Sequence, residues 1–246
     1  MNELVLDNIY KKGSKGKRVR LIQEWLSLNN IHVCVDGDFG PATEEAVRQF
    51  QEREGLKKDG IVNKKTYSRL VFPMKQALTP ITVNEKSLGE MIISYAVQHT
   101  QQTPREIGGQ NKGPWVRLYM NGHEGPQWPW CAGFACFILK KACKTLEVAL
   151  PIKPSFSCDS LAVDAQQRGL FIKENNVLDK TQITPGSFFL VRRTSTDWIH
   201  TGIVESAGED FFYSIEGNTN DEGNREGYEV CQRIRGYKSK DFIVFE

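Results

Sequence analysis

Apolar side chains recur at helical spacing in the first part of the chain. They form two predicted helical faces, at Val19, Ile22, Trp25 and Leu26 and at Ala46, Val47 and Phe50. Asp-Gly pairs at 36–37 and 59–60 mark turns after these faces, and Thr43 is placed to cap the second helix. A short third helix follows over 66–70. The pattern therefore predicts an N-terminal three-helix bundle, and no internal repeat is visible in it.

From residue 87 onward the pattern begins with helices and changes to strands. Ser87 and Glu90 match a capping box, Cys131 opens a buried helical run, and another helix is expected over 158–168. Apolar runs bounded by turn residues then predict strands at 187–193, 198–206, 210–217, 229–235 and 241–245. Helices first and antiparallel strands second are typical of an α+β domain.

Residues 73–86 separate these two parts. Pro73 and Pro80 flank this stretch, which has mixed polarity and no clear period, so we expect a linker. The chain is thus predicted to consist of one domain at 1–72, the linker, and a second domain at 87–246. The second domain is long enough to bury a core of its own.

Composition narrows the class of protein. The 246 residues are 39% hydrophobic and 25% charged, which are ordinary values for a soluble globular chain. No apolar stretch is long enough to span a membrane, and the N-terminus lacks the basic start and apolar run of a secretory signal. We therefore expect a protein that is made in the cytoplasm without a signal peptide and has no membrane partner.

A basic segment at 11–20 carries most of the excess positive charge of the first domain. Such a segment can attract an anionic polymer, but a solvated N-terminal stretch is the simpler interpretation. No zinc-finger spacing or aromatic RNA-recognition motif accompanies it, so nucleic acid is not expected as a partner.

Cys131 stands out among the six cysteines of the chain. No pair of them has the C-x-x-C spacing of zinc or thioredoxin-type sites, and no metal or cofactor is predicted. Cys131 begins a predicted helix, whose positive end lowers the pKa of a thiol and favours the nucleophilic thiolate. His200 lies on a predicted strand, and Glu216 and Asn218 end the next one. Adjacent antiparallel strands can bring His200 beside Glu216, which would orient a catalytic base.

A dense set of motif positions runs through residues 11–72. It includes two early glycines, the apolar face of the first helix, both Asp-Gly turns and the run DGDFGPATEEAVRQFQ. Together these resemble the peptidoglycan-binding domain type 1. Asn63 stands where that family usually has Gly, and Asn also tolerates a left-handed backbone. The resemblance implies a module that binds bacterial peptidoglycan; a helical bundle that has lost binding is the alternative.

Four short motifs occur in order in the second domain: WCAGF at 130–134, TPGS at 184–187, HTGIV at 200–204 and IEGN at 215–218. Over residues 115–235 they resemble the CHAP family, the cysteine, histidine-dependent amidohydrolases/peptidases of the papain-like NlpC clan. The resemblance implies a papain-like α+β fold with an antiparallel sheet, and cleavage of an amide in peptidoglycan. The family's nucleophile and base carry over onto Cys131 and His200. Its acidic partner carries over onto Glu216, and its assisting amide onto Asn218.

Residues near Cys131 are assigned to the substrate. Gln127 is expected as a second oxyanion donor beside the backbone N–H of Cys131. Trp128, Trp130 and Trp198 are expected to bind substrate, with packing against the helix as the alternative for the first two. The loop before Cys131 carries one acid in NGHEGPQWPW, so the calcium that some relatives bind is not expected here.

The sequence as a whole predicts a peptidoglycan hydrolase with a cysteine nucleophile, tethered to its substrate by the first domain. The alternatives are a non-catalytic wall-binding protein with a degenerate hydrolase fold, which intact Cys131, His200 and Glu216 disfavour, and a papain-like transferase or deamidase acting on a host protein. The scissile bond is either the N-acetylmuramoyl–L-alanine amide or a peptide bond of the stem or crossbridge. Without a signal peptide, the enzyme would act as a phage endolysin, or as an effector that needs delivery machinery and an immunity protein.

Overall fold

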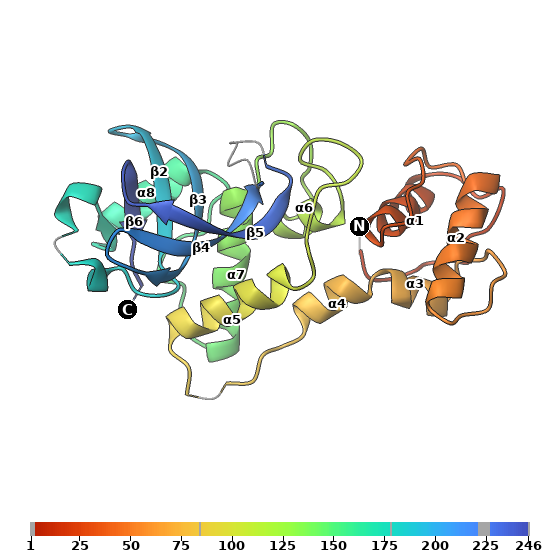
Figure 1. Cartoon of the computed structure of the whole chain (residues 1–246), viewed down its shortest axis with the longest axis horizontal. Helices are drawn as coiled ribbons and strands as arrows, with labels where there is room; N and C mark the ends of the chain where they lie inside the picture. Colours follow the sequence, from red (N-terminus) through yellow and green to blue (C-terminus); the bar gives the residue numbers. More distant parts are fainter. Residues whose placement is uncertain (1–2, 84, 178, 221–226, 246) are drawn as a thin grey trace.

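The computed structural model describes residues 3–83, 85–177, 179–220 and 227–245. A group of helices near the N-terminus lies at one end of the molecule and a six-stranded sheet lies at the other (Figure 1). Helices together with an antiparallel sheet make this an α+β chain, as predicted. None of the described helices is both long and apolar enough to cross a membrane.

Three short helices share the first core: α1 (Lys17–Leu28), α2 (Pro41–Arg53) and α3 (Lys64–Leu70). Their buried side chains include the predicted apolar positions Val19, Ile22, Trp25, Leu26, Ala46, Val47 and Phe50. Helix α1 packs against both α2 and α3. The predicted cap at Thr43 is wrong, because α2 begins two residues earlier, at Pro41, and Thr43 lies inside its first turn.

Two buried glutamines reveal an internal repeat that the sequence pattern did not show. Gln23 on α1 and Gln51 on α2 each reach to the next Asp-Gly turn and to a threonine beyond it. The partners of Gln23 are Asp36, the Gly37 N–H and Thr43, and those of Gln51 are Asp59, the Gly60 N–H and Thr66. Each carboxamide therefore fixes one turn to the start of the following helix.

The segment predicted as a linker begins as a helix, α4 (Phe72–Leu78), with a proline in its first turn, where the missing N–H breaks no hydrogen bond. Only residues 79–87 between the units lack helix or strand, apart from one that lies outside the described residues. The predicted capping box is present at the start of α5 (Leu88–Thr100), with hydrogen bonds in both directions between Ser87 and Glu90. Helix α4 packs against α5, so helices connect the two units.

The antiparallel sheet forms much of the second unit, in the order β1-β6-β2-β3-β4-β5. Its strands are β1 (Phe171–Ile172), β2 (Phe188–Thr194), β3 (Asp197–Ala207), β4 (Phe211–Thr219), β5 (Glu229–Gly236) and β6 (Lys240–Ile243). Strands β2 to β5 are neighbours in chain order, and β6 returns to pair with β2. All five predicted strands are therefore present, the last as the shorter β6, in a sheet that places β3 near its middle.

Helices pack on this sheet and bring their first residues to β3. Helix α7 (Cys131–Leu146) contacts β3 and β4, and α8 (Cys158–Gln167) contacts β3. Close packing depends on Gly217 in β4, where a Cβ would meet the Cβ of Phe134 at 2.7 Å. The shorter elements are α6 (Pro114–Tyr119), η1 (Glu174–Asn176) and η2 (Lys180–Gln182).

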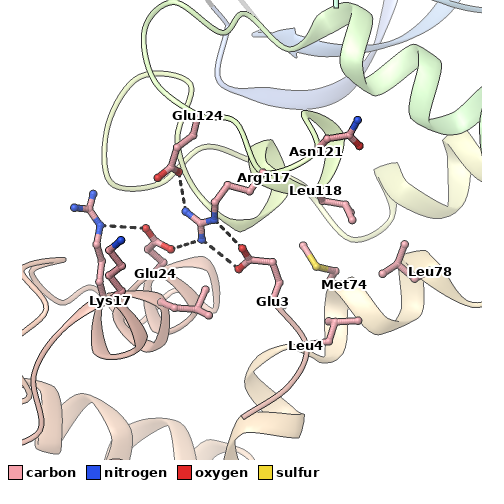
Figure 2. A pocket seen from close by; sticks show the side chains of 13 residues that line it. Glu3, Leu4, Lys17, Glu24, Met74, Leu78, Arg117, Leu118, Asn121 and Glu124 are labelled. Atoms are coloured by element: carbon pink, nitrogen blue, oxygen red, sulfur yellow. Dashed lines mark hydrogen bonds and ion pairs between the residues drawn. The ribbon is translucent and has the colours of Figure 1, made fainter. Parts of the chain in front are cut away.

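Arg117, on α6, joins the two units through a cluster of partly buried ion pairs. Its guanidinium lies 2.7 Å from a carboxylate oxygen of each of three glutamates, two in the first unit and one in the second: Glu3, Glu24 and Glu124 (Figure 2). These residues line a cavity of about 610 Å³ at the junction. Burial opposes the charge on Arg117, but its hydrogen bonds with the first unit outweigh burial and raise its pKa.

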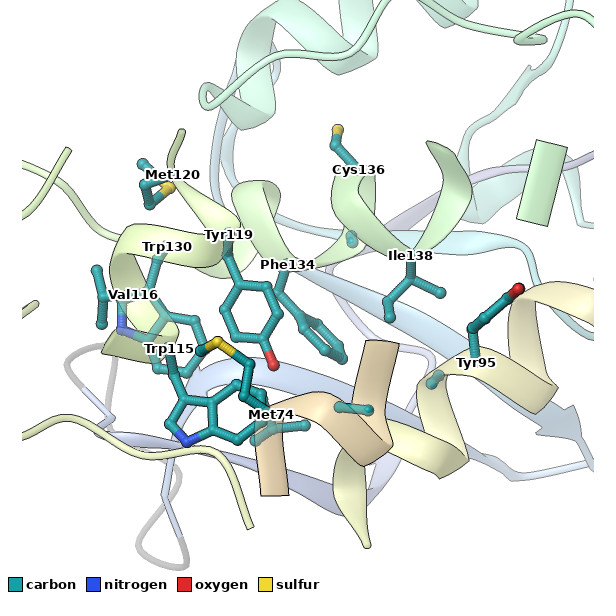
Figure 3. Packing of buried hydrophobic residues seen from close by; sticks show 14 of the residues in the cluster. Met74, Tyr95, Trp115, Val116, Tyr119, Met120, Trp130, Phe134, Cys136 and Ile138 are labelled. Carbon is teal, nitrogen blue, oxygen red and sulfur yellow. The ribbon is translucent and has the colours of Figure 1, made fainter. Parts of the chain in front are cut away.

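Apolar packing continues across the same junction. Met74 of α4 lies beside Trp115 and Tyr119 of α6 (Figure 3), and all three are at most 2% exposed. Trp25 of α1 meets Trp115 edge-on, with ring centroids 6.2 Å apart. One hydrophobic cluster therefore runs through both units.

Candidate active site

Cys131 is the first residue of α7, as predicted. Trp130, the residue before it, makes no capping hydrogen bond with its side chain, so the first N–H groups of α7 are left to the space around the cysteine. The Cys131 side chain is 5% exposed. The positive end of α7 therefore favours a negative charge on a sulfur that lies almost entirely out of bulk water.

His200 and Glu216 meet across β3 and β4. The pairing of Ile203 with Ile215 sets the register, and its continuation puts His200 and Glu216 on one face as diagonal neighbours. His200 Nε2 lies 2.8 Å from Glu216 Oε2, and the Glu216 side chain is fully buried. The structure thus brings together the two residues that the strand pattern placed side by side.

Arg235, on β5, holds the Glu216 carboxylate from the other side. Its Nε donates to Glu216 Oε1 at 2.8 Å and its Nη2 donates to Oε2 at 2.6 Å, while the Ser214 hydroxyl donates to Oε1 at 2.6 Å. Burial disfavours the charged carboxylate, but the bonds from Arg235 and His200 outweigh it and hold the pKa of Glu216 far below its usual range. Glu216 is therefore a fixed negative charge behind His200.

Three groups contact the Cys131 sulfur: the Cys158 thiol, the His200 ring and the backbone N–H of Thr201. Because Glu216 occupies His200 Nε2, Nδ1 is the ring nitrogen left for the cysteine. The hydrogen bond from Cys158, together with those from His200 and Thr201, outweighs burial and holds the pKa of Cys131 well below its ordinary value.

His200 carries the matching positive charge. Burial disfavours the charged ring, but hydrogen bonds with Cys131 and Glu216 raise the pKa of His200 to about 9. At neutral pH the pair is therefore a thiolate facing an imidazolium. This is the protonation state in which a cysteine attacks a carbonyl and a histidine can protonate the leaving group.

Two further predicted residues are not drawn into this contact network. Asn218 has a left-handed backbone (φ 56°), and its Oδ1 is buried without a hydrogen-bond partner in the part of the chain that the structure describes. Glu216, rather than Asn218, bonds the histidine. Gln127 is exposed on the loop before Cys131, with its carboxamide oxygen beside Gly125. Its part in an oxyanion hole stays a prediction.

The tryptophans assigned to substrate separate into buried and accessible ones. Trp130 is fully buried and donates from Nε1 to Glu106 at 2.8 Å. Trp198 is 5% exposed, and its Nε1 donates to Asp241 at 2.9 Å. The assignment of Trp130 and Trp198 to substrate binding is therefore corrected, because each ring packs in the interior and its polar atom is already bonded.

Trp128 alone of the three remains available to a ligand. It is half-buried, and its ring stacks on His123 with centroids 4.3 Å apart. Phe156 meets both rings edge-on. Trp128 lies three residues before Cys131 and Phe156 two residues before Cys158, so these aromatic side chains come from the loops that precede α7 and α8.

Gly202 lets Glu216 reach His200. A Cβ at this position of β3 would meet Glu216 Cγ and Phe189 Cε1, each at 2.7 Å. Any larger residue would therefore push the carboxylate out of place. The HTGIV motif therefore needs glycine at position 202 for a steric reason, because a side chain there would collide with Glu216.

Arg235 and Cys158 are the site residues that the sequence analysis did not single out. Arg235 lies on the predicted 229–235 strand, where the residues facing the same way, Cys231 and Arg233, are half-buried and Gln232 and Ile234 are exposed. No signal in the sequence marks this inward charge, because the apolar Ile234 is the residue that faces outward. Cys158 begins the predicted helix at 158–168, just as Cys131 begins its own helix.

Comparisons with known proteins bear on the first unit. Residues 15–70 match the family model described as "Putative peptidoglycan binding domain". A "Zinc D-Ala-D-Ala carboxypeptidase" from Streptomyces albus G is 34% identical over 73 residues, which cover 28% of this chain and 29% of that protein. The match confirms the predicted peptidoglycan-binding domain, and the chain spans under a third of the carboxypeptidase.

Two solved structures also show similarity to this chain. The N-terminal domain of SleB is 37% identical, with a TM-score of 0.27, and the match covers 27% of this chain and 93% of that one. A fused Zn-dependent amidase/peptidase/peptidoglycan-binding protein from Clostridium acetobutylicum is 17% identical, with a TM-score of 0.25, over 93% of this chain and 61% of that one. Across the described ranges of the present chain, no three His, Cys, Asp or Glu side chains gather in a way that could hold a metal ion.

Proposed function

We propose that this chain is a peptidoglycan hydrolase that cleaves an amide bond with Cys131 as nucleophile, on a CHAP-like second domain of the papain-like kind. One observation carries the proposal. A cysteine at a helix start, with a lowered pKa, contacts a histidine whose other ring nitrogen is bonded to a buried carboxylate. Nucleophile, base and orienting group in this order form the arrangement that cysteine hydrolases use.

The first half of the reaction forms a thioester. The Cys131 thiolate attacks the amide carbon, and the oxygen becomes an oxyanion beside the first N–H groups of α7. The backbone N–H of Cys131 is the donor that this position supplies, with Gln127 proposed as a second. His200, as the imidazolium, gives its proton to the leaving amine, and the C–N bond breaks.

The second half restores the enzyme. Neutral His200 takes a proton from water, the hydroxide attacks the thioester carbon, and the Cys131 thiolate leaves. The His200 ring is charged again when it holds this proton, and Glu216 keeps the ring oriented through both halves. Arg235 keeps Glu216 ionised, so the line from Arg235 to Cys131 has alternating charges.

Peptidoglycan is proposed as the polymer because the first unit is of the peptidoglycan-binding type. Binding by one unit raises the concentration of wall amides around the other. Of the three tryptophans assigned to substrate, Trp128 is the one that stays half-exposed, and an aromatic ring can pack on the apolar face of a sugar.

The test is digestion of purified sacculi, with the products identified by mass spectrometry. Wild type should release peptides or glycan fragments, and Cys131→Ala should release none. Cys143→Ala, the same substitution near the other end of α7, is the matched control and should keep the activity. Free glycan chains would assign cleavage to the N-acetylmuramoyl–L-alanine amide, and shortened stems still linked to glycan would assign it to a peptide bond. Equal release by wild type and Cys131→Ala would refute the proposal.

A non-catalytic wall-binding protein is the second candidate, favoured by the match of the first unit to a binding domain alone. The two candidates differ in the reactivity of one thiol. A catalytic Cys131 should react with iodoacetamide at pH about 6 much faster than a free cysteine with an ordinary pKa of about 8.5. Labelling of Cys131 no faster than that of free cysteine, together with sacculus binding but no products, would establish the non-catalytic protein.

A further inference from the structure

The thiol of Cys158 interacts with the sulfur of Cys131, and the mechanism above does not use it. Cys131 is the first residue of α7 and Cys158 is the first residue of α8, so two helix starts converge on one point. The two thiols share a hydrogen bond. A second cysteine in contact with a nucleophilic one gives the site a chemistry beyond hydrolysis.

The surrounding contacts hold the two helix starts together. In the first turn of α8, Asp159 Oδ1 accepts from the Trp198 N–H at 2.6 Å, which ties this turn to β3. On α7, Cys136 Sγ donates to the carbonyl oxygen of Ser155 at 3.4 Å, which ties α7 to the loop before α8. His200, on the same β3, contacts Cys131. The sulfurs are thus neighbours because three elements fix them.

The two cysteines differ in charge in the way expected of a reactive cysteine and a resolving cysteine. Cys131 is held as a thiolate, whereas the bond to Cys131 and burial raise the pKa of Cys158, which stays a protonated thiol. Cys131 is 5% exposed and Cys158 is 7% exposed. Hydrogen peroxide is small enough to reach a thiolate with this exposure.

We propose that Cys131 and Cys158 form a peroxide-sensitive pair, in which oxidation of Cys131 is captured by Cys158 as a reversible disulfide that switches hydrolysis off. The Cys131 thiolate attacks one peroxide oxygen, the O–O bond breaks, and sulfenic acid and hydroxide form. The Cys158 sulfur then attacks the sulfenic sulfur; the S–O bond breaks, and its oxygen leaves as water with the Cys158 proton. The two thiols lose two electrons to the peroxide, and a dithiol reductant returns them.

Capture by Cys158 would protect the nucleophile. Sulfenic acid that finds no thiol is oxidised further to sulfinic acid, which ordinary thiols do not reduce. The disulfide consumes the attacking sulfur but keeps it recoverable. The inference concerns the same cysteine as the proposed hydrolysis, yet its chemistry is measured on the thiols and does not require that hydrolysis occur.

The experiment treats the full chain with hydrogen peroxide, then with dithiothreitol, and maps the cysteines by mass spectrometry after each step. Wild type should give a peptide that links Cys131 to Cys158, and the link should disappear on reduction. Cys158→Ser keeps a hydroxyl donor toward Cys131 but cannot form the link, so its Cys131 should reach sulfinic acid and stay oxidised. Cys143→Ala is the matched control and should link as wild type does.

Activity on sacculi, where present, should fall in proportion to the linked fraction and return with dithiothreitol in wild type, but not in Cys158→Ser. The proposal is overturned if peroxide leaves Cys131 reduced. It is also overturned if wild-type Cys131 reaches sulfinic acid as fast as in Cys158→Ser, or if Cys158 pairs with another cysteine. A reversible Cys131–Cys158 link in a protein without lytic activity would uphold this inference while refuting the proposed hydrolysis.

Discussion

Replacing Arg235 with methionine should show how firmly the site depends on a charge that never touches substrate. The substitution removes two charge-assisted hydrogen bonds to Glu216, at 2.8 and 2.6 Å, and leaves this carboxylate fully buried. Each such bond contributes about 1.5–3 kcal/mol, and breaking a buried ion pair costs about 3–5 kcal/mol. We therefore expect Arg235→Met to lower the free energy of unfolding by about 3–5 kcal/mol.

Urea unfolding, followed by tryptophan fluorescence, measures this loss. The matched control is Arg193→Met, because Arg193 pairs with Asp197 on the surface and its side chain is 57% exposed; it should cost at most about 1 kcal/mol. Arg235→Lys keeps the charge without the two-pronged geometry and should fall between them. Equal losses in Arg235→Met and Arg193→Met would refute the claim that Arg235 neutralises a buried carboxylate.

Three further predictions concern protonation and packing. Because the pKa of His200 is raised to about 9, the rate of hydrolysis should fall as pH rises through that value and the imidazolium is lost; a rate unchanged on both sides would contradict the assignment. Burial lowers the pKa of His99 from 6.5 to about 3, so the unfolded chain binds a proton that the folded one does not. Stability should therefore fall by about 1.4 kcal/mol per pH unit below 6.5, and a His99→Gln variant with the same slope in a urea titration would argue against it. Gly202→Ala should lose about 1–3 kcal/mol and most activity, since its Cβ would meet Glu216, while Gly236→Ala, with no atom within 4 Å, should lose neither in the same two assays.

The parts of the site that could be predicted depend on local pattern. Cys131 was identifiable because the helix that it begins has a clear apolar period. His200 and Glu216 were identifiable because both strands are bounded by turn residues, and neighbouring strands share a face by geometry. The α+β class follows from the same two periods.

The parts that were missed depend on contacts between distant segments. Cys158 reaches Cys131 only because α7 and α8 both pack on β3, and no local spacing encodes that meeting. Trp130 and Trp198 were assigned to substrate because they flank the catalytic motifs, but tertiary packing buries both. The helix at 72–78 was missed because a proline at its start resembles a break in the pattern although it suits a first turn.

The junction around Arg117 fixes the position of the first unit relative to Cys131. Moving the first unit away from the second would separate Arg117 from Glu3 and Glu24 and open the contact between Trp25 and Trp115. These contacts therefore hold the two units at one separation and orientation. A glycan strand gripped by the first unit would present its stem peptides to Cys131 at a set distance and direction. The spacing of the cleaved bonds would then follow the repeat of the glycan strand. Short soluble fragments, which cannot reach from the first unit to Cys131, would be poor substrates.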